Sequence, residues 1–255
     1  AQLRERPIFS VEIVERNIAR GRGAVSCVAS ASDCVVVGTT RGYLLRYDFS
    51  QGTSPVSEIE LSKAAAASVS AVFLDGTAFH VLACVSTDVV LENHYVHAKW
   101  KKSRLMSKLK GVAVTSVGWN EEKVTEQSTG PALVGTAHGV LAELQVEEKD
   151  KREKHFKHLY ILGEGREPVN TVEVKSSSGR TVVMAVTPTR FYLFAGDSHL
   201  EVLFAAYNSR KIPLSALIEL PGDETHTSQL FVDHELDSFA WLAQPGIYHG
   251  HISHP

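Results

Sequence analysis

The sequence predicts an all-β fold, because one hairpin pattern recurs along it. In the clearest example, residues 132–144, a short apolar run leads into the turn residues 135–139, and a second run follows in which apolar and polar residues loosely alternate. This pattern is typical of two antiparallel strands joined by a tight turn. Residues 35–47 match it almost position for position, and weaker examples lie at residues 82–91, 183–193 and 239–248.

The spacing of these hairpins indicates a repeat protein. When their turns are aligned, successive positions are about 48, 49, 51 and 56 residues apart, a period found in propellers and solenoids. The aligned positions are Thr39, Thr87, Thr136, Thr187 and Ala243. We therefore predict a β-propeller of four-stranded antiparallel blades, with roughly five blades visible.

Each blade needs one strand before its hairpin and one after it. The preceding, inner strands are expected at residues 25–28, 69–72, 114–117, 169–172 and 227–230. The outer strands are expected at residues 56–61, 98–106, 156–162 and 200–205, whereas the fifth repeat shows no outer strand. Since propellers commonly have about four to eight blades, we expect these five to belong to a larger ring of about seven.

The two ends of the chain suggest a part of a longer protein. Residues 7–15 read as a strand ahead of the first repeat, and we expect it to complete the outer edge of the last blade. The sequence has no initiator Met, and its last repeat stops at Pro255. We accordingly expect residues 1–255 to be an incomplete N-terminal propeller.

Composition is that of an ordinary soluble domain. Of the 255 residues, 44% are hydrophobic and 22% are charged, and the formal net charge of -3 predicts no nucleic-acid partner. No apolar run approaches the length that spans a bilayer, so we expect a cytoplasmic chain. Cys27, Cys34 and Cys84 lie in apolar runs without a metal-binding spacing, and buried thiols are expected.

No catalytic signature is present. The sequence lacks a Gly-x-Ser-x-Gly elbow, a phosphate-binding loop and a His-Glu-x-x-His motif, and the inner strands carry acids only at their ends, at Asp75 and Glu173. We assign no catalytic, cofactor-binding or metal-binding residue and predict a protein that is not an enzyme. The alternative is a propeller hydrolase with a metal in its channel. His249 and His251 would share one face of a strand, although nothing nearby completes a ligand set.

Two charged stretches have alternative interpretations. Residues 99–110, from Lys99 to Lys110, place cations among Trp100, Leu105 and Met106. We favour the interpretation that this stretch forms an outer strand whose charges discourage edge pairing. The alternative is a peripheral membrane-binding module. The mixed-charge run 147–155 reads as a solvated loop, or alternatively as a loop that binds a partner.

Several segments, in the same order along the chain, resemble the N-terminal region of the vacuolar protein sorting-associated protein 18 (deep orange) family. They are Pro7-Ile8-Phe9, Ser116-Val117-Gly118-Trp119-Asn120, Ser128-Thr129-Gly130-Pro131, Leu133-Val134-Gly135-Thr136, Leu203-Phe204-Ala205-Ala206-Tyr207 and Phe239-Ala240-Trp241. Residues 148–154, 184–190 and 246–250 look most similar to the plant-type members.

The resemblance implies a β-propeller and a role in trafficking. Members of the family continue into an α-solenoid and a RING domain, which we expect to be absent from this chain, and they are core subunits of the class C tethering complexes HOPS and CORVET. The implied function is a non-catalytic scaffold in endosome-to-vacuole or lysosome transport and membrane fusion. The implied partners are other class C vacuolar protein sorting subunits, with Rab GTPases and SNAREs reached through the complex. The implied location is the cytoplasmic surface of late endosomes and of the vacuole or lysosome.

Overall fold

The computed structural model describes residues 9–11, 13, 16–18, 20–50, 56–149, 155–209, 216–220, 228–233, 237–243 and 246–252. Most of the predicted N-terminal strand, residues 7–15, therefore lies outside the described residues. Its described members, Phe9, Ser10, Val11 and Ile13, are exposed and belong to no strand.

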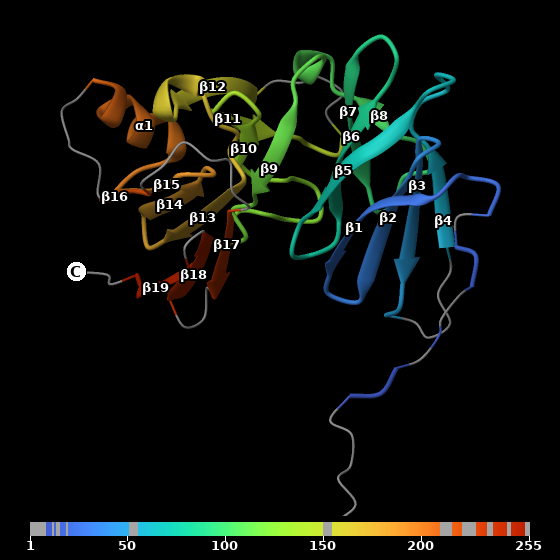
Figure 1. The fold of residues 1–255 in the computed structure, drawn as a ribbon, viewed down its shortest axis with the longest axis horizontal. Helices are drawn as coiled ribbons and strands as arrows, with labels where there is room; N and C mark the ends of the chain where they lie inside the picture. Colours follow the sequence, from blue (N-terminus) through green and yellow to red (C-terminus); the bar gives the residue numbers. More distant parts are fainter. Residues whose placement is uncertain are drawn as a thin grey trace, which may run out of the picture.

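Five antiparallel sheets follow one another along the chain, and each is one blade (Figure 1). The first blade contains β1 (Val25–Ala31), β2 (Cys34–Thr39), β3 (Tyr43–Asp48) and β4 (Val56–Glu60). The second contains β5 (Ser68–Leu74), β6 (His80–Ser86), β7 (Leu91–His97) and β8 (Arg104–Leu105). The third contains β9 (Val114–Gly118), β10 (Ala132–Thr136), β11 (Val140–Gln145) and β12 (His155–Ile161).

The remaining two blades differ from each other in size. The fourth contains β13 (Thr171–Ser177), β14 (Arg180–Val186), β15 (Arg190–Gly196) and β16 (Ala216–Glu219). The fifth contains β17 (Gln229–Asp233), β18 (Ser238–Ala243) and β19 (Gly246–His251), and no fourth strand within the described ranges. All five predicted hairpins are confirmed, as is the propeller-type succession of blades.

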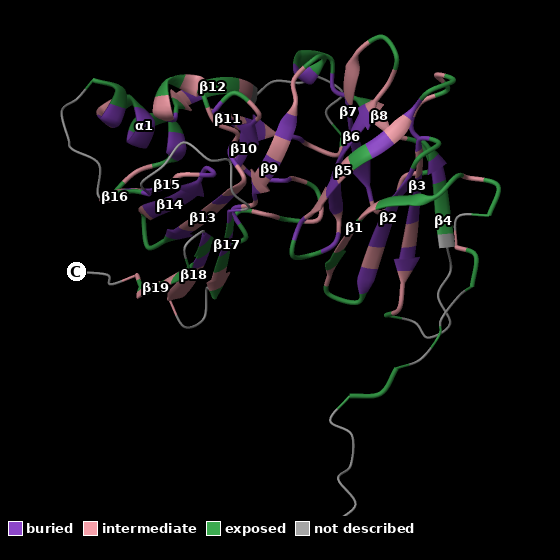
Figure 2. Ribbon diagram, in the orientation of Figure 1, coloured by how far each residue is buried: buried purple, intermediate pink, exposed green. Residues whose placement is uncertain are grey.

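The blades lie along an open arc. Figure 1 shows β1–β4 at one end and β17–β19 at the other. Neighbouring blades touch through their inner strands, with β1 against β5, β5 against β9, β9 against β13 and β13 against β17. Figure 2 shows that buried residues concentrate in the middle strands of the blades.

The hydrophobic core is divided among the interfaces between blades. Val36 of β2 and Val81 of β6 belong to one buried cluster between the first two blades. Three further clusters join the second blade to the third, the third to the fourth and the fourth to the fifth. Each blade therefore needs a neighbour to bury its faces, as repeat architectures do.

The aligned threonines explain why the repeat is visible in the sequence. Each hydroxyl oxygen accepts a hydrogen bond from a backbone N–H on the far side of its hairpin turn. The bonds are Thr39 with Tyr43 at 3.2 Å, Thr87 with Val90 at 3.0 Å, Thr136 with Val140 at 3.1 Å and Thr187 with Arg190 at 3.1 Å. Ala243, at the same position of the fifth repeat, has no hydroxyl to offer. The recurring residue thus closes a turn rather than performing chemistry.

Polar residues in the inner strands, or just before them, join neighbouring blades. The Ser26 hydroxyl donates to the Val69 carbonyl oxygen at 2.6 Å, which links the first blade to the second. The equivalent bond from Thr115 to the Val169 carbonyl oxygen is 2.7 Å long, and the neighbouring Ser116 donates to the same oxygen at 2.9 Å. Both link the third blade to the segment that enters the fourth. The Asn170 amide donates to Ser228 at 3.1 Å ahead of the fifth blade. These bonds satisfy backbone groups that the packing of blades would otherwise bury without partners.

One predicted strand is wrong. Residues 200–205 lie in the helix α1 (Leu200–Asn208), and the outer strand of the fourth blade is β16 instead. The buried side chains of α1 recur at helical spacing: Leu200, Leu203, Phe204 and Tyr207. Their contacts include Phe204 against Phe194 of β15, with ring centroids 5.0 Å apart. The buried side chains of this segment thus follow the helical period of 3.6 residues, which the prediction of a strand did not take into account.

A second prediction is confirmed only in part. Of residues 98–106, Arg104 and Leu105 alone form the outer strand β8, which pairs with His94 and Tyr95 of β7. A short 3-10 helix, η1 (Ser107–Leu109), follows it directly. Another, η2 (Gly163–Gly165), follows β12. Residues 99–110 therefore do not form the continuous outer strand that the favoured interpretation implied.

Candidate interaction surface

The two acids at the ends of the predicted inner strands lie in different surroundings. Asp75 is fully buried, and its carboxylate accepts the backbone N–H groups of Thr77 at 3.0 Å and His80 at 2.6 Å, so it holds a turn. Glu173 lies half-buried on β13. Among the described residues, no group of three or more His, Cys, Asp and Glu side chains could hold a metal ion. The described residues therefore provide no set of metal ligands for the alternative interpretation, a metal-dependent propeller hydrolase.

His249 and His251 do lie together, as their alternation on a strand predicts. Both belong to β19, and their ring centroids are 5.3 Å apart. Cys34 and Cys84 are buried thiols, as expected, whereas Cys27 is only half-buried. Burial raises the pKa of the Cys84 thiol to about 12, which keeps it protonated and inert near neutral pH.

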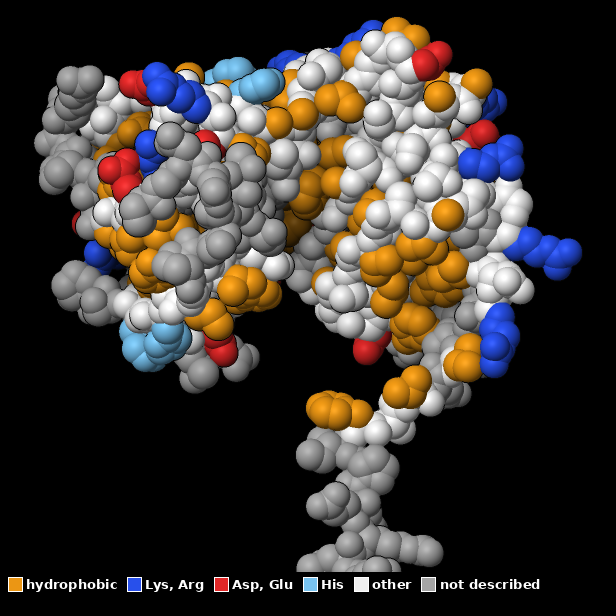
Figure 3. Space-filling model, in the orientation of Figure 1, with side chains coloured by type: hydrophobic (Ala, Val, Ile, Leu, Met, Phe, Trp, Pro, Cys, Tyr) orange, Lys and Arg blue, Asp and Glu red, His pale blue; other side chains and the backbone are white. Residues whose placement is uncertain are grey.

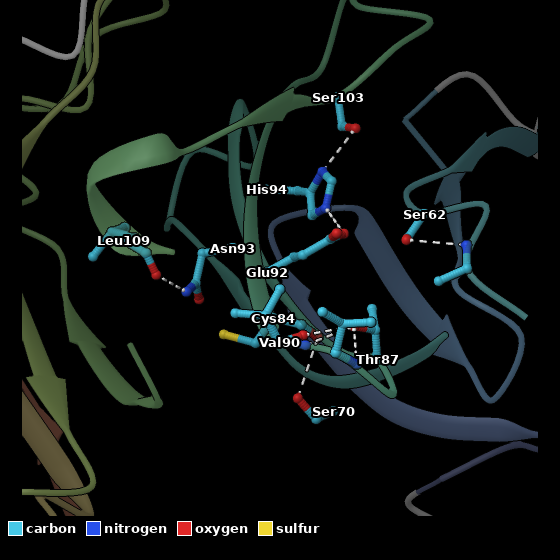
Figure 4. A network of polar contacts seen from close by, with 12 residues as sticks. Ser62, Ser70, Cys84, Thr87, Val90, Glu92, Asn93, His94, Ser103 and Leu109 are labelled. Carbon is cyan, nitrogen blue, oxygen red and sulfur yellow. Dashed lines mark hydrogen bonds and ion pairs between the residues drawn. The ribbon is translucent and has the colours of Figure 1, made fainter. Parts of the chain in front are cut away.

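Two side chains of β7 fasten the basic stretch, residues 99–110, onto the second blade (Figure 4). The Asn93 amide donates to the carbonyl oxygens of Leu109 at 2.7 Å and Val112 at 2.9 Å. The His94 ring lies between the Ser103 hydroxyl, 3.1 Å away, and the Glu92 carboxylate, 3.0 Å away. The stretch is therefore held through the Ser103 side chain and the Leu109 backbone, and the chain just after it is held at Val112.

An aromatic cluster supports the start of the stretch. The Trp100 ring packs edge-on against Tyr95, with centroids 5.3 Å apart, and the Arg104 guanidinium lies over the Trp100 ring at 4.7 Å. Arg104 also donates to the carbonyl oxygens of Glu147 at 3.4 Å and Glu148 at 3.3 Å, just beyond β11 of the third blade. Arg104 thus combines a cation–π contact with a bond across the seam between two blades.

Two buried histidines complete this seam. The His80 ring nitrogens lie 2.7 Å from the Tyr95 hydroxyl and 2.7 Å from the Thr125 carbonyl oxygen. The His97 ring lies 2.7 Å from the Glu126 carbonyl oxygen. Burial lowers the pKa of His80, which favours a neutral ring. These histidines hold the loop that precedes β10, a role that their scattered positions in the sequence do not reveal.

A groove opens above the cluster. Its volume is about 780 Å³, and it is lined by Lys99, Trp100, Lys101, Lys102, Ser103, Arg104, Glu148 and Lys149. Lys101, Lys102 and Lys149 are exposed, whereas Lys99 pairs with Glu126. The groove brings together the basic stretch and the beginning of the mixed-charge run, of which residues 150–154 lie outside the described residues. Cations outnumber acids among these lining residues, which favours an anionic occupant.

No helix in the described ranges is long and apolar enough to cross a membrane.

The comparisons agree with the fold and identify the family. The propeller domain of Myceliophteria thermophila Cps50 (Swd1) superposes with a TM-score of 0.56 at 10% identity, covering 87% of this chain and 66% of that one, which supports the fold alone. Vacuolar sorting protein 18 of Arabidopsis thaliana is 39% identical over 97% of the chain, and the Danio rerio vacuolar protein sorting-associated protein 18 homolog is 25% identical over 98%.

These alignments span 25% and 27% of the two relatives, so the chain covers about a quarter of their length. The higher identity to the Arabidopsis protein agrees with the plant-type resemblance. Residues 7–255 match the model of the Pep3/Vps18/deep orange β-propeller domain. The chain therefore belongs to the Pep3/Vps18/deep orange β-propeller domain family.

Proposed function

We propose that the chain is a non-catalytic interaction scaffold, the propeller of a subunit of the class C tethering complexes HOPS and CORVET. The observation that carries this proposal is the similarity, over nearly the whole chain, to proteins named for vacuolar sorting. In this role the scaffold acts in endosome-to-vacuole or lysosome transport and in membrane fusion. It is located on the cytoplasmic side of late-endosomal and vacuolar membranes, and it is held there peripherally by the complex.

The polar groups of the inner strands support a scaffold over an enzyme. Ser26, Ser116 and Asn170 hydrogen-bond to backbone carbonyls of the following blade or of the segment that leads into it. Side chains used in this way hold the blades in fixed relation, which leaves loops and outer strands as the variable surfaces. Sister class C subunits are the proposed direct partners, with Rab GTPases and SNAREs reached through the complex.

We further propose that residues 1–255 contribute five blades to a larger ring of about seven, in a subunit whose α-solenoid and RING domain lie outside this chain. Apolar side chains are exposed at both ends of the arc. Val28 of the first blade is 57% exposed, and Phe231 and Ile247 of the fifth are 53% and 70% exposed. Figure 3 shows hydrophobic side chains gathered over β1–β3. Neighbouring blades cover such faces in a closed propeller.

The test compares full-length subunits with and without this region. We expect deletion of residues 1–255 to remove at least one class C subunit from the purified complex, or to abolish endosomal targeting. A control in which an unrelated propeller replaces residues 1–255 distinguishes the loss of specific partner contacts from the mere absence of a domain of this size. If deletion leaves both the subunit composition and the targeting intact, the proposed function is wrong.

A further inference from the structure

We propose that the groove beside Trp100 is a docking site for an acidic peptide segment of a partner protein. The proposal names the chemistry of one partner contact, and so it rests on the proposed function as an interaction scaffold. Direct binding to the purified chain tests it separately from the recovery of class C subunits.

The wall of the groove formed by Trp100 and Arg104 is held by contacts within the seam between the blades. Trp100 is held by Tyr95, at 5.3 Å between centroids, and by His97, at 5.9 Å. The Arg104 guanidinium over its ring is itself fixed to backbone carbonyls of the third blade. Since His97 and Tyr95 are buried, this wall of the groove cannot shift without disturbing the seam between the blades. Preorganised walls reduce the entropy lost when a flexible peptide binds.

The charges on the rim favour an anionic occupant. Lys101 and Lys102, next to the outer strand of the second blade, and Lys149, which follows β11 of the third, line the groove, and all three are exposed. No ion pair among the described residues engages Lys101 or Lys102. Carboxylates placed between these lysines would gain charge-assisted hydrogen bonds, while the Trp100 ring would offer a contact for an apolar or aromatic neighbour.

The same surroundings argue against a lipid bilayer as the occupant. The cations line a concave groove, and Glu126, Glu147 and Glu148 lie beside it. A flat anionic membrane would press its charges against these acids together with the lysines, whereas a peptide can place separate carboxylates at the lysines and a neutral residue at Glu148, which lines the groove. Leu105 is 45% exposed, and it is the one large exposed apolar residue in the described stretch 99–110. Membrane-binding surfaces usually combine cations with several apolar side chains.

The energetics predict a weak contact that salt suppresses. Exposed ion pairs are individually weak, so three lysines support a contact of modest affinity. Such contacts become effective when other surfaces of an assembly hold the partner nearby. Because the lysines are exposed, the attraction should fall as ionic strength rises.

The experiment measures the binding of a fluorescently labelled peptide rich in Asp and Glu with one Phe. The purified chain is compared with the double variant Lys101→Glu/Lys102→Glu and with the control Lys63→Glu/Lys110→Glu. The control makes the same change in charge at exposed lysines outside the groove. We expect the groove variant to bind about tenfold more weakly and the control to bind within about twofold of the unmodified chain. A matched peptide with Asn and Gln in place of the acids should not bind, and added salt should weaken the binding of the acidic peptide.

Three results would overturn the proposal: no binding of the acidic peptide, equal losses in both double variants, or tighter binding to phosphatidylserine-containing vesicles than to the peptide. The last outcome, with loss of vesicle binding in the groove variant, would make the groove a membrane contact. Circular dichroism and thermal melting establish that each variant is folded. If charge reversal prevents folding, Lys101→Gln/Lys102→Gln tests the same loss of positive charge.

Discussion

Replacing Gly135 by valine is expected to lower the free energy of unfolding by about 3 kcal/mol. Gly135 lies in β10, where the inner strand of its own blade and the segment leading into the next blade approach its Cα. A Cβ atom there would lie 2.7 Å from Val169 Cβ and would also overlap the Ser116 hydroxyl. The Ser116–Val169 hydrogen bond that links the two blades would have to move, and urea denaturation followed by circular dichroism measures the cost.

The control for this prediction is Gly246→Val. Gly246 is also in a hairpin strand, β19, but a Cβ atom at this position would meet nothing within 4 Å. We expect the control to change the free energy of unfolding by about 0.5 kcal/mol or less. Gly38 occupies the place of Gly135 in the first blade, where a Cβ would lie 2.6 Å from Val69 Cγ1. Equal effects of the changes at Gly135 and Gly246 would show that the blades are not packed as described.

Replacing Trp241 by alanine is expected to cost about 4 kcal/mol of stability. Trp241 is fully buried, and its ring packs against Tyr248 and Phe191, with centroids 5.1 Å and 5.9 Å away. Its indole N–H donates to the Ser228 hydroxyl at 2.7 Å. The change therefore leaves a large cavity between the fourth and fifth blades and an unpaired hydroxyl within it.

Phe231→Ala is the matched control, because it also removes an aromatic ring from the fifth blade. Phe231 lies on the opposite face of the sheet and is 53% exposed, so we expect a loss of about 1 kcal/mol or less. Thermal and urea unfolding of both variants measures the difference. A loss for Trp241→Ala no larger than that of the control would contradict the packing of the fifth blade against the fourth.

The hairpins could be predicted because their signals are local. A strand alternates with period two, and the turn that closes it needs particular residues within a few positions. The first and third hairpins even share one register, since Val37 pairs with Leu45 and Val134 pairs with Ala142 at equal distances from their turn threonines. The threonine that accepts a turn hydrogen bond recurs in the first four repeats, so the period stays visible even where the strand sequences differ.

The helix α1 was missed because its sequence satisfies two patterns. Leu200 to Ala205 is a segment of strand length that is apolar except for Glu201, and its position after a hairpin favoured a fourth strand. The buried residues at helical spacing extend to Tyr207, beyond the predicted segment. The actual strand, β16, is only four residues long and leaves Leu217 and Ile218 exposed, so it carries little of the alternation that reveals a half-buried strand.

The groove could not be predicted as a unit because its parts are remote in sequence. Arg104 reaches carbonyls 43 and 44 residues away, and His80 reaches Thr125, 45 residues away. The sequence marks residues 99–110 as basic, but it does not show which cations are held by other groups. Only the fold distinguishes Arg104, fixed over Trp100, from Lys101 and Lys102 at the rim.

The most direct test of the scaffold function is amide hydrogen exchange of the chain alone and within the assembled class C complex. We expect protection on assembly in loops and outer strands, including residues 99–104, while the inner strands β5, β9 and β13 exchange as they do in the chain alone. Protection confined to those inner strands, or no protection in any blade, would contradict a function in partner binding through the outer surfaces of the propeller.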